Sequence, residues 1–544
     1  MTEVITVDNI GLKGINTDVA AWSLPPEFIT RGDNFRIYAG SIFASGGYAE
    51  WSTAPELFFP GYLMHTGSLS GDYWVVLGRT KVYSFDGQTW TDISSVEGYT
   101  NLGEDDELLW TGCELANIPI FNNPRSYPEY WNPKSPGQVL QALNFDSGQT
   151  WETKAISCEV MRSHKNFLIA LGIHEGGIDY PHVVRISTAA DINGLPYTWD
   201  ETDKSGLAVR FQIGGDSGKI IDGKTLRDSF VIYSESGIDM ITFVGGEFLW
   251  KLTELSSTVG VLSKNSIVEV KGLHYFISDG DILVNNGTTI KSIMHGRIKR
   301  SFATRINPAR YHTSYSVINN RLKEIWFCVP TDLALYPNRA YIYNWTDDSW
   351  STRKLPYDYD TGTEVLIDAT SFIAYGVQTE PQRPWDSWEG TWTSQLGIWK
   401  GNNISPLDYT LAGVMRDSSR IRLMDPVDKA DSPYEPAIIE RTSFPLEGHR
   451  NVTTISRVYP LMVGTTPVEI SMGSQDYPGA PVRWKTPVVF LPGKDRKIDV
   501  RTTGELHCWR IASINEYKDE SIDSGVGNWS ISGMVIEYSL DGAR

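Results

Sequence analysis

The stretch SIVEVKGLHYFISDGDILVNNG, residues 266–287, contains three short strand-like runs separated by turn dipeptides. Runs rich in β-branched and aromatic residues alternate with Lys-Gly, Asp-Gly and Asn-Gly, and glycine-containing dipeptides of this kind mark tight turns. Three antiparallel strands within about 22 residues make up most of one four-stranded propeller blade. This stretch therefore predicts a β-propeller.

The same rhythm recurs along much of the chain. Strand-length runs flank turns in residues 73–85, 229–246 and 324–345. Aromatic residues make up 12% of the chain, and it contains 49 Gly and 28 Pro. Aromatic residues favour strands, and Gly and Pro punctuate turns. Helical periodicity is poor, with 106–117 as the one modest helix candidate. We predict an all-β fold with a central β-propeller.

A short motif appears twice. YSFDGQTWTDIS at 83–94 and YNWTDDSWSTRKL at 343–355 each place a tyrosine seven residues before a tryptophan, with Asp in the intervening turn. The tryptophans are Trp90 and Trp350. A ring of this size can cap the outer strands of a blade and pack against a neighbouring one. The spacing predicts that both tryptophans are structural and that the two segments are imperfect copies of a repeat.

The last hundred residues follow a different plan. Residues 438–544 contain several strand-like runs in succession, which indicates a compact β-sandwich. The Pro- and Asp-rich run 425–436 is the best candidate for a domain boundary. The sequence predicts three regions: an N-terminal segment, 1–50, that packs on the sandwich or closes the propeller; a propeller with inserted loops, 51–430; and a platform-like sandwich, 431–544.

The composition describes an acidic, folded protein. The formal net charge is −18, with 48 Lys or Arg against 66 Asp or Glu. Proteins that grip nucleic acid need basic surface, and basic residues gather only at 291–305 and 416–422, neither densely. The four cysteines are scattered and form no CxxC pair. We expect no secretion signal at the N-terminus and no membrane span, because the longest apolar runs are too short.

The motif at 83–94 also raises the question of sugar chemistry, because several glycan-cutting propeller enzymes carry a Ser-x-Asp-x-Gly-x-Thr-Trp turn. Here the residue between Asp86 and Gly87 is missing. Even a perfect copy of this turn stabilises the fold and does no chemistry, whereas a glycosidase needs two carboxylates that flank the scissile bond. Acids and arginines are abundant enough that the sequence leaves such a site open, but no pattern marks one.

Other catalytic and metal-binding patterns are missing. The sequence has no HExxH, GxxxxGK[ST] or GxSxG. The closest histidines, His174 and His182, flank an expected loop, and the acidic runs 104–107 and 279–281 match no calcium loop. We therefore assign no catalytic, cofactor-binding or metal-binding residue, expect no cofactor, and predict that the protein is not an enzyme.

Three regions of the chain resemble the tail nozzle, or tail-tube, proteins of short-tailed bacteriophages. The first is 9–48, which contains NIGLKGINTDV, LPP and GDNFR and has Gly-Gly at 46–47, just before its end. The second is 226–287, which is similar to the central blades of that family. The third combines VEISMGSQDYPGAPVRW at 468–484, KIDVRTTGELHCWRI at 497–511 and WSISGMVIEYSLDGAR at 529–544. Together these segments cover about a third of the chain and span its length.

The resemblance implies a ring of six subunits that docks onto an adaptor ring next to the portal and lets DNA pass through its lumen at ejection. Tail fibres would be further partners. It also implies a virion protein made in the host cytoplasm. The acidic composition fits a conduit to which DNA does not adhere. On this hypothesis the irregular stretch 376–404 either narrows the channel or docks a fibre or neighbouring subunit. The alternatives are a propeller glycan hydrolase, a receptor-binding tail component, or a carbohydrate-binding module without catalysis.

Overall fold

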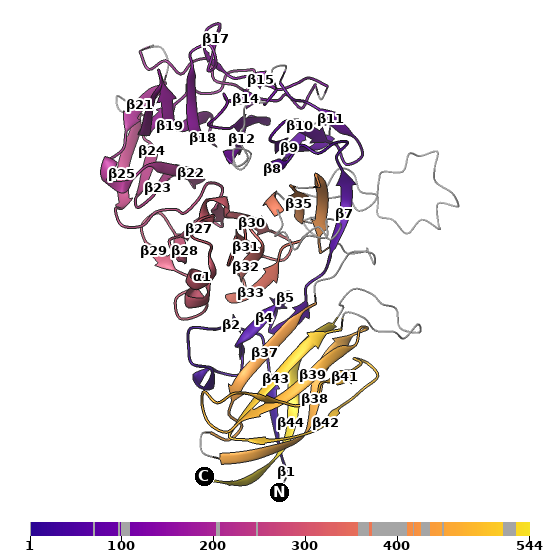
Figure 1. The fold of residues 1–544 in the computed structure, drawn as a ribbon. Coiled ribbons are helices and arrows are strands. Elements are labelled where there is room, and N and C mark those ends of the chain that lie inside the picture. The colour runs from indigo at the N-terminus through magenta and orange to yellow at the C-terminus, as the bar shows by residue number, and fades with distance from the viewer. Residues whose placement is uncertain are drawn as a thin grey trace, which may run out of the picture.

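The computed structural model describes residues 2–543 apart from 69–70, 96–97, 100–108, 136, 203–206, 246–248, 357–368, 373–410, 417, 426–435, 449–450 and 515–528. The regular secondary structure of the described residues is almost entirely β-strand. Figure 1 shows a ring of small sheets in the upper part of the molecule and two larger sheets below it, near both chain termini. No helix of the described residues is long and apolar enough to cross a membrane.

The upper unit is a β-propeller whose described residues form seven blades, each a sheet of four or six strands, and one additional two-stranded sheet. In blades 1 to 5 the four strands follow each other in chain order and pair antiparallel. Blade 1 contains β8 (Pro60–Ser68), β9 (Gly71–Gly78), β10 (Val82–Phe85) and β11 (Trp90–Asp92), and blade 2 contains β12 (Thr111–Leu115), β13 (Ile118–Asn122), β14 (Glu129–Tyr130) and β15 (Gln141–Ala142). Blade 3 contains β18 (Ile156–His164), β19 (Phe167–Glu175), β20 (Ile178–Ile186) and β21 (Val209–Gln212), and blade 4 contains β22 (Ile220–Leu226), β23 (Ser229–Ser234), β24 (Ile238–Phe243) and β25 (Trp250–Ser256). Blade 5 contains β26 (Ile267–Val270), β27 (Leu273–Ser278), β28 (Asp281–Asn285) and β29 (Ile290–Ser292).

Blades 6 and 7 take strands from the N-terminal segment. Blade 6 carries two short parallel strands outside its fourth strand, and the outer strand of blade 7 comes from the start of the chain. A hairpin of β16 (Asn144–Asp146) and β17 (Gln149–Thr150) follows blade 2. The strands are β30 (Tyr315–Asn319), β31 (Glu324–Val329), β32 (Arg339–Asn344), β33 (Ser349–Lys354), β2 (Gly14–Ile15) and β3 (Phe28–Ile29) in blade 6, and β34 (Ala369–Phe372), β35 (Leu411–Met415), β36 (Arg420–Met424) and β7 (Tyr48–Thr53) in blade 7.

The seven blades form a closed ring. The first strand of each blade contacts the first strand of the next one, from β8 through β12, β18, β22, β26 and β30 to β34, and β34 contacts β8. A ring of blades leaves only short, protected sheet edges. Strand β7 closes the ring, because it pairs with β36 of the last blade, where Tyr48 lies opposite Met424, and then continues along the chain into β8 of the first blade.

The lower unit consists of two six-stranded sheets whose buried faces share one hydrophobic cluster. This is the two-layer arrangement of a β-sandwich. One sheet contains β1 (Thr2–Asp8), β5 (Phe35–Tyr38), β6 (Ser41–Ala44), β38 (Asn451–Gly464), β42 (Ile498–Gly504) and β44 (Trp529–Ala543). The other contains β4 (Arg31–Asp33), β37 (Ile438–Phe444), β39 (Val468–Gln475), β40 (Arg483–Trp484), β41 (Val488–Phe490) and β43 (Leu506–Ser513).

The N-terminal segment passes back and forth between the two units. Strands β1, β4, β5 and β6 belong to the sandwich, whereas β2, β3 and β7 belong to the propeller. A division of the chain at residue 50 would therefore fall inside β7. Gly14 has a φ of 72°, and a Cβ there would lie 2.2 Å from the carbonyl oxygen of Trp350, so a larger residue would push the segment off blade 6. We refer to residues 2–53 as the strap.

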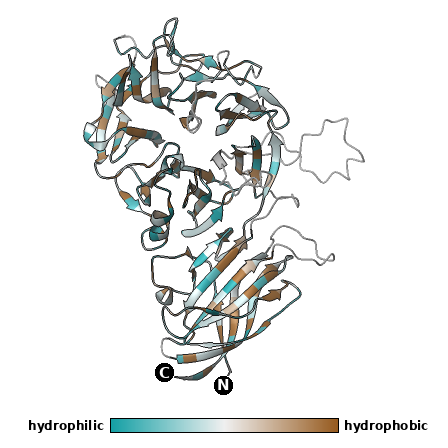
Figure 2. Cartoon of the chain, viewed as in Figure 1, coloured by the Kyte–Doolittle hydropathy of each residue, from teal (hydrophilic) through white to brown (hydrophobic). Residues whose placement is uncertain are grey.

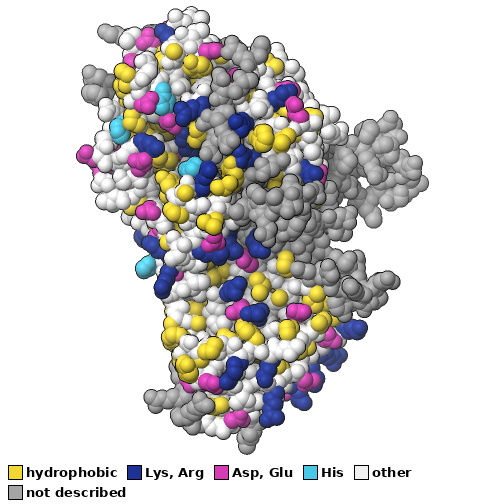
Figure 3. Space-filling view, viewed as in Figure 1, with side chains coloured by type: hydrophobic (Ala, Val, Ile, Leu, Met, Phe, Trp, Pro, Cys, Tyr) yellow, Lys and Arg dark blue, Asp and Glu magenta, His cyan; other side chains and the backbone are white. Residues whose placement is uncertain are grey.

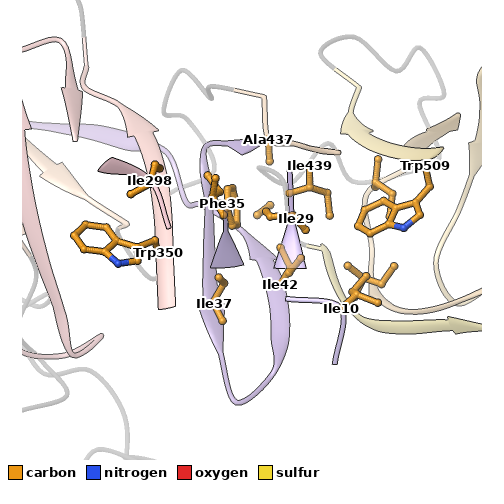
Figure 4. Close-up of a cluster of buried hydrophobic side chains, with 14 of the residues drawn as sticks. Ile10, Ile29, Phe35, Ile37, Ile42, Ile298, Trp350, Ala437, Ile439 and Trp509 are labelled. Carbon is orange, nitrogen blue, oxygen red and sulfur yellow. The ribbon is translucent and has the colours of Figure 1, made fainter. Parts of the chain in front are cut away.

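One continuous hydrophobic cluster joins the two units through the strap. Figure 4 shows Phe35, Ile29 and Ile42 of the strap between Trp350 of blade 6 and Trp509 of the sandwich. All but Trp509 are fully buried, and Trp509 is 3% exposed. Hydrophobic residues follow the strands of both units (Figure 2). Because the cluster does not stop at the boundary, the propeller and the sandwich share part of one core.

The expected helix at 106–117 is wrong where it can be checked. Residues 111–115 form β12, the innermost strand of blade 2, and 101–108 lie outside the described residues. In β12 the residues Thr111, Cys113 and Leu115 are buried and alternate with less buried ones. The alternation has the period of two that belongs to a strand. The contacts of β12 with the first strands of the neighbouring blades thus determine the conformation of a segment whose local sequence pattern is weak.

The two copies of the Tyr-Trp motif also differ in register. Each motif forms a four-residue loop between the third and fourth strands of its blade, but Phe85 faces Trp90 across one loop while Asn344 faces Ser349 across the other. Trp350 therefore lies one residue further along than Trp90, on the opposite face of its blade. Trp350 is fully buried, whereas Trp90 is only partly buried, and it stacks on Phe85 at 4.9 Å.

We expect different costs for these two tryptophans. Trp350→Ala should lower the free energy of unfolding by about 3–5 kcal/mol, since it leaves a large cavity in the shared core. Trp90→Ala should cost roughly half of that or less, because a half-buried ring removes less area from water. Thermal melts of both variants measure this difference, and equal melting temperatures would contradict the register described here.

The strap should be indispensable for folding. Removing residues 1–50 takes away the strap's share of the core and half of the strand that closes blade 7. We expect limited proteolysis of the folded protein to leave 1–50 attached, because its backbone is paired on both units. A fragment 51–544 that stays folded and melts like the full chain would show that the strap is dispensable.

Candidate functional site

The centre of the propeller holds a network of charged side chains. Arg162 on β18 donates from Nε and Nη2 to the two carboxylate oxygens of Asp222 on β22, at 2.9 and 2.8 Å. It also donates to the carbonyl of Gly112 on β12 and to Oδ1 of Asn265, just before β26. Asp222 is almost fully buried, and its second oxygen also accepts from the backbone N–H of Asn265. Each charge in the network therefore has a partner.

This network crosses the axis of the ring. Asn265 of blade 5 donates to the carbonyl of Trp110, which precedes the first strand of blade 2. Lys264 of blade 5 forms a 2.6 Å ion pair with Glu159 of blade 3. Bonds between blades that are not neighbours can only pass through the middle. The axis of a single propeller is therefore bridged by protein side chains, and a nucleic-acid duplex does not thread it.

The local electrostatics hold the network charged. Burial by itself would raise the pKa of Asp222, but the Arg162 guanidinium and two backbone N–H groups outweigh it and keep that pKa below its ordinary value. Nearby, part of the Lys224 side chain is exposed, and its Nζ donates to the carbonyl of Ile267 at 3.2 Å. Desolvation of the ammonium group by the surrounding protein and the charge of Arg162 lower the pKa of Lys224 to about 8.

A second buried network lies where the strap enters blade 7. Arg353 on β33 donates to both carboxylate oxygens of Asp425 at 2.9 and 2.8 Å, to the carbonyl of Gly46 and to the hydroxyl of Tyr48. Its guanidinium also lies over the rings of Tyr48 and Trp326. Arg353 and Asp425 are both at least nine-tenths buried. One arginine thus ties blade 6, the strap and the end of β36 together.

A buried carboxyl lies beside this network. Glu324 begins β31, is 3% exposed, and accepts a hydrogen bond from the indole of Trp326 at 3.0 Å. Burial raises the pKa of Glu324 to about 7; Asp425 adds to the rise, while Trp326, Arg36 and Arg353 oppose it. The group is therefore partly protonated near neutral pH in the folded protein.

The basic stretches noted in the sequence are largely neutralised. In 291–305, Arg297 pairs with Asp348, Lys299 with Asp281, and Arg305 with Asp332. Lys299 and Arg305 belong to α1 (Lys299–Arg305), whose first two N–H groups are capped by Asp18 of the strap. In 416–422, Arg420 pairs with Glu50, and Arg416 lies over the ring of Tyr336. Both stretches serve the fold.

The other residues singled out in the sequence also have structural partners. Asp86 accepts hydrogen bonds from the N–H groups of Gln88 and Thr89 and from the Thr89 hydroxyl, so its carboxylate forms the turn. His174 bridges Glu159 and Asp179 through its two ring nitrogens, at 2.9 and 2.7 Å. In 279–281, Asp281 binds Lys299. The runs 104–107 and 376–404 lie outside the described residues.

Two hollows on the surface are relevant to the glycan-cutting alternative. One, of about 170 Å³, contains a single carboxylate, Asp86. Another, of about 520 Å³, lies between blade 6 and the sandwich and is lined by Asp33 and Glu469 among others. Asp33 forms two hydrogen bonds to Arg339. Within the described ranges, no group of three or more His, Cys, Asp or Glu is arranged to hold a metal ion.

The sequence analysis missed one charged surface. Residues 483–501 hold six basic residues against two acidic ones, and all eight lie on or between β40, β41 and β42. These strands form one side of the sandwich, and Figure 3 shows Lys and Arg gathered along that side. The basic residues are Arg483, Lys485, Lys494, Arg496, Lys497 and Arg501, which we call the basic edge. The signal was present in the sequence but spread over three strands.

Comparisons with known proteins give likenesses of fold. No protein-family model matches the chain, and no curated protein matches it. Among solved structures, the Neurospora crassa Pan2 WD40 domain covers 71% of this chain and 98% of its own, at 8% identity and a TM-score of 0.38. YCF48 bound to a D1 peptide covers 72% and 98%, at 10% identity and a TM-score of 0.35. An exo-β-1,3-galactanase from Phanerochaete chrysosporium covers 90% and 99%, at 10% identity and a TM-score of 0.27. At these values no activity can be transferred.

The buried carboxyl Glu324 should make stability depend on pH. Its pKa is raised on folding, so the folded chain holds a proton that the unfolded chain releases as pH rises above the ordinary range of Glu. Stability should therefore fall between about pH 4.5 and pH 7 and level off above that. Glu324→Gln, which keeps an acceptor for Trp326, should remove this fall and stabilise the protein at pH 8 by on the order of 3 kcal/mol. Urea unfolding at pH 4 and pH 8 tests this, and parallel curves for both proteins would contradict it.

Proposed function

We propose that the protein is a structural subunit of a short bacteriophage tail, in which a ring of copies forms a nozzle that conducts and gates DNA at ejection. The resemblance of three segments spread over the chain supports this proposal. The observation that carries it is architectural: the strap and the shared core join a closed propeller to a sandwich and hold them together as one unit. A subunit that must keep its shape under the passage of DNA needs such a connection.

The bridged axis of the propeller bears on how such a conduit would be built. Since Arg162, Asp222 and Asn265 fill the centre of one propeller, the lumen cannot lie inside a subunit. It has to lie between subunits, as in a ring with a rotation axis outside each chain. The proposed partners follow from this: further copies of the chain, six in the ring that the resemblance implies, an adaptor ring, and fibres.

The net negative charge of the chain supports a lumen through which DNA passes without adhering to the protein. Six copies would carry a large negative charge, and an acidic lumen would repel the phosphate backbone. The strongest competing function, glycan hydrolysis, needs two carboxylates flanking a sugar. In the described part of the chain, the carboxylates that line the two hollows include Asp86 and Asp33, which are already engaged by the fold.

Electron microscopy of the purified full chain, alone and with extracts of assembled particles, tests the proposal. We expect six-fold rings with a central channel wide enough for duplex DNA, and the same rings in the tail. A protein that stays monomeric and releases sugar from surface glycans would overturn the nozzle and support the hydrolase.

DNA binding should be weak. With a labelled duplex at about 150 mM salt, where the Debye length is about 8 Å, we expect no saturable binding in the nanomolar range. The reason is that acidic residues outnumber basic ones overall and that many described cations on the propeller, Arg162, Arg297 and Lys299 among them, form ion pairs. Tight binding that persists at this salt would contradict the acidic conduit.

A further inference from the structure

The basic edge is distinctive because much of it has no partner within the chain. Arg483 pairs with Asp476, and Lys497 shares Asp499 with Arg457. The other four residues, Lys485, Lys494, Arg496 and Arg501, are exposed, and their side chains form no ion pair or hydrogen bond with the described residues. Asp495 is engaged by the backbone N–H of Leu491. Exposed cations gathered on one side of the sandwich form a surface that an acidic partner can recognise.

The acidic charge of the chain is concentrated elsewhere. Residues 48–256, which span β7 and blades 1 to 4, contain 28 Asp or Glu and 14 Lys or Arg. All other residues together contain 38 acidic and 34 basic ones. The molecule is therefore polarised, with an acidic half of the propeller and a basic edge on the sandwich. Both complementary surfaces belong to the same chain.

One place in the acidic half has carboxylates that lack a counter-charge. On blade 4, Glu254 of β25 lies directly opposite Asp239 of β24. Like charges at opposed positions of a strand pair destabilise the sheet unless a cation is near. No described cation is paired with either residue, and burial together with Glu254 raises the pKa of Asp239. Glu254 is exposed, as is Leu252, two residues before it on the same strand at 42% exposure.

The two surfaces lie on opposite flanks of the molecule. In Figure 1, β25 is at the left margin of the propeller, and β41 and β42 are at the right margin of the sandwich. A contact between different surfaces on opposite flanks is the heterologous kind, which generates a ring when the rotation closes. Val489 of β41, which lies between Lys485 and Lys494 in the sequence, is an apolar side chain with 46% exposure. It can pack against Leu252 at the centre of a polar rim.

We propose that the basic edge of one copy docks on the outer strand of blade 4 in the next copy, where Arg496 and Arg501 neutralise the exposed Glu254 beside the buried Asp239. This inference rests on the proposed ring and specifies the surfaces that build it. The partner is a second copy of this chain. A contact of the basic edge with DNA phosphates or with an acidic adaptor is a different outcome of the test.

The test uses charge reversal in the full chain and measures the oligomeric state by light scattering and electron microscopy. R496E/R501E should raise the concentration at which rings assemble by about ten-fold or more, because each lost pair becomes a repulsive one. Adding Glu254→Lys should restore assembly in large part. The matched control K271E/K291E changes the same charge at exposed propeller positions and should assemble normally. Melting temperatures of all variants establish that each is folded.

The outcomes separate this inference from the proposed function. Rings of the unaltered chain that persist in R496E/R501E overturn the docking surface and leave the nozzle standing. If R496E/R501E forms no rings and the added Glu254→Lys does not restore them, blade 4 is not the surface on which the basic edge docks. If the rings of R496E/R501E are unchanged but bind duplex DNA or the adaptor less than the unaltered chain does, that partner is the one that contacts the basic edge. A chain that forms no rings at any concentration overturns both proposals.

Discussion

The shared hydrophobic core under the strap is the constraint on which the rest of the structure depends. Phe35, Ile29 and Ile42 lie between Trp350 of the propeller and Trp509 of the sandwich, so neither unit can complete its core without the first fifty residues. The same segment supplies the closing strand of blade 7 and the cap of α1. The packing of this segment therefore sets the closure of the ring, the attachment of the sandwich and the orientation of the two units together.

Two buried ion networks add directionality to this core. Arg162 and Asp222 hold the centre of the propeller, and Arg353 and Asp425 hold the seam where the strap enters it. Replacing a buried pair by hydrophobic residues often costs little, but removing one partner is expensive. Each network connects strands that are distant in the sequence, with Arg162 and Asp222 sixty residues apart. Such pairs therefore specify which blades meet.

The filled axis constrains any function in transport. A propeller whose centre is bridged by side chains is a solid building block and not a tube. A conduit made from it must come from association, and the polarised charge of the chain offers a way for copies to recognise one another. In the ring that we propose, long-range attraction between the acidic half and the basic edge would speed the encounter of two copies and select its orientation, whereas the apolar residues at the contact would determine how long it lasts.

The sequence by itself determined the local β structure. The run 266–287 predicted three strands, and β26, β27 and β28 lie within it, because turn dipeptides and strand periodicity act over a few residues. The two Tyr-Trp motifs predicted two turns between strands, and both exist. Local spacing could not reveal that Trp90 and Trp350 lie on opposite faces, because a shift of one residue leaves the spacing unchanged but reverses the side chain.

Only the tertiary structure decided what depends on partners far away in the chain. Ile5 pairs with Ile536 and Tyr48 with Met424, and no local pattern encodes contacts over such separations. Strand β12 took its conformation from the ring of first strands against a helical expectation. The basic edge formed because β40, β41 and β42 bring together cations that are diluted in the sequence. Buried charges found their partners for the same reason: their energy depends on distance in space, and folding alone sets that distance.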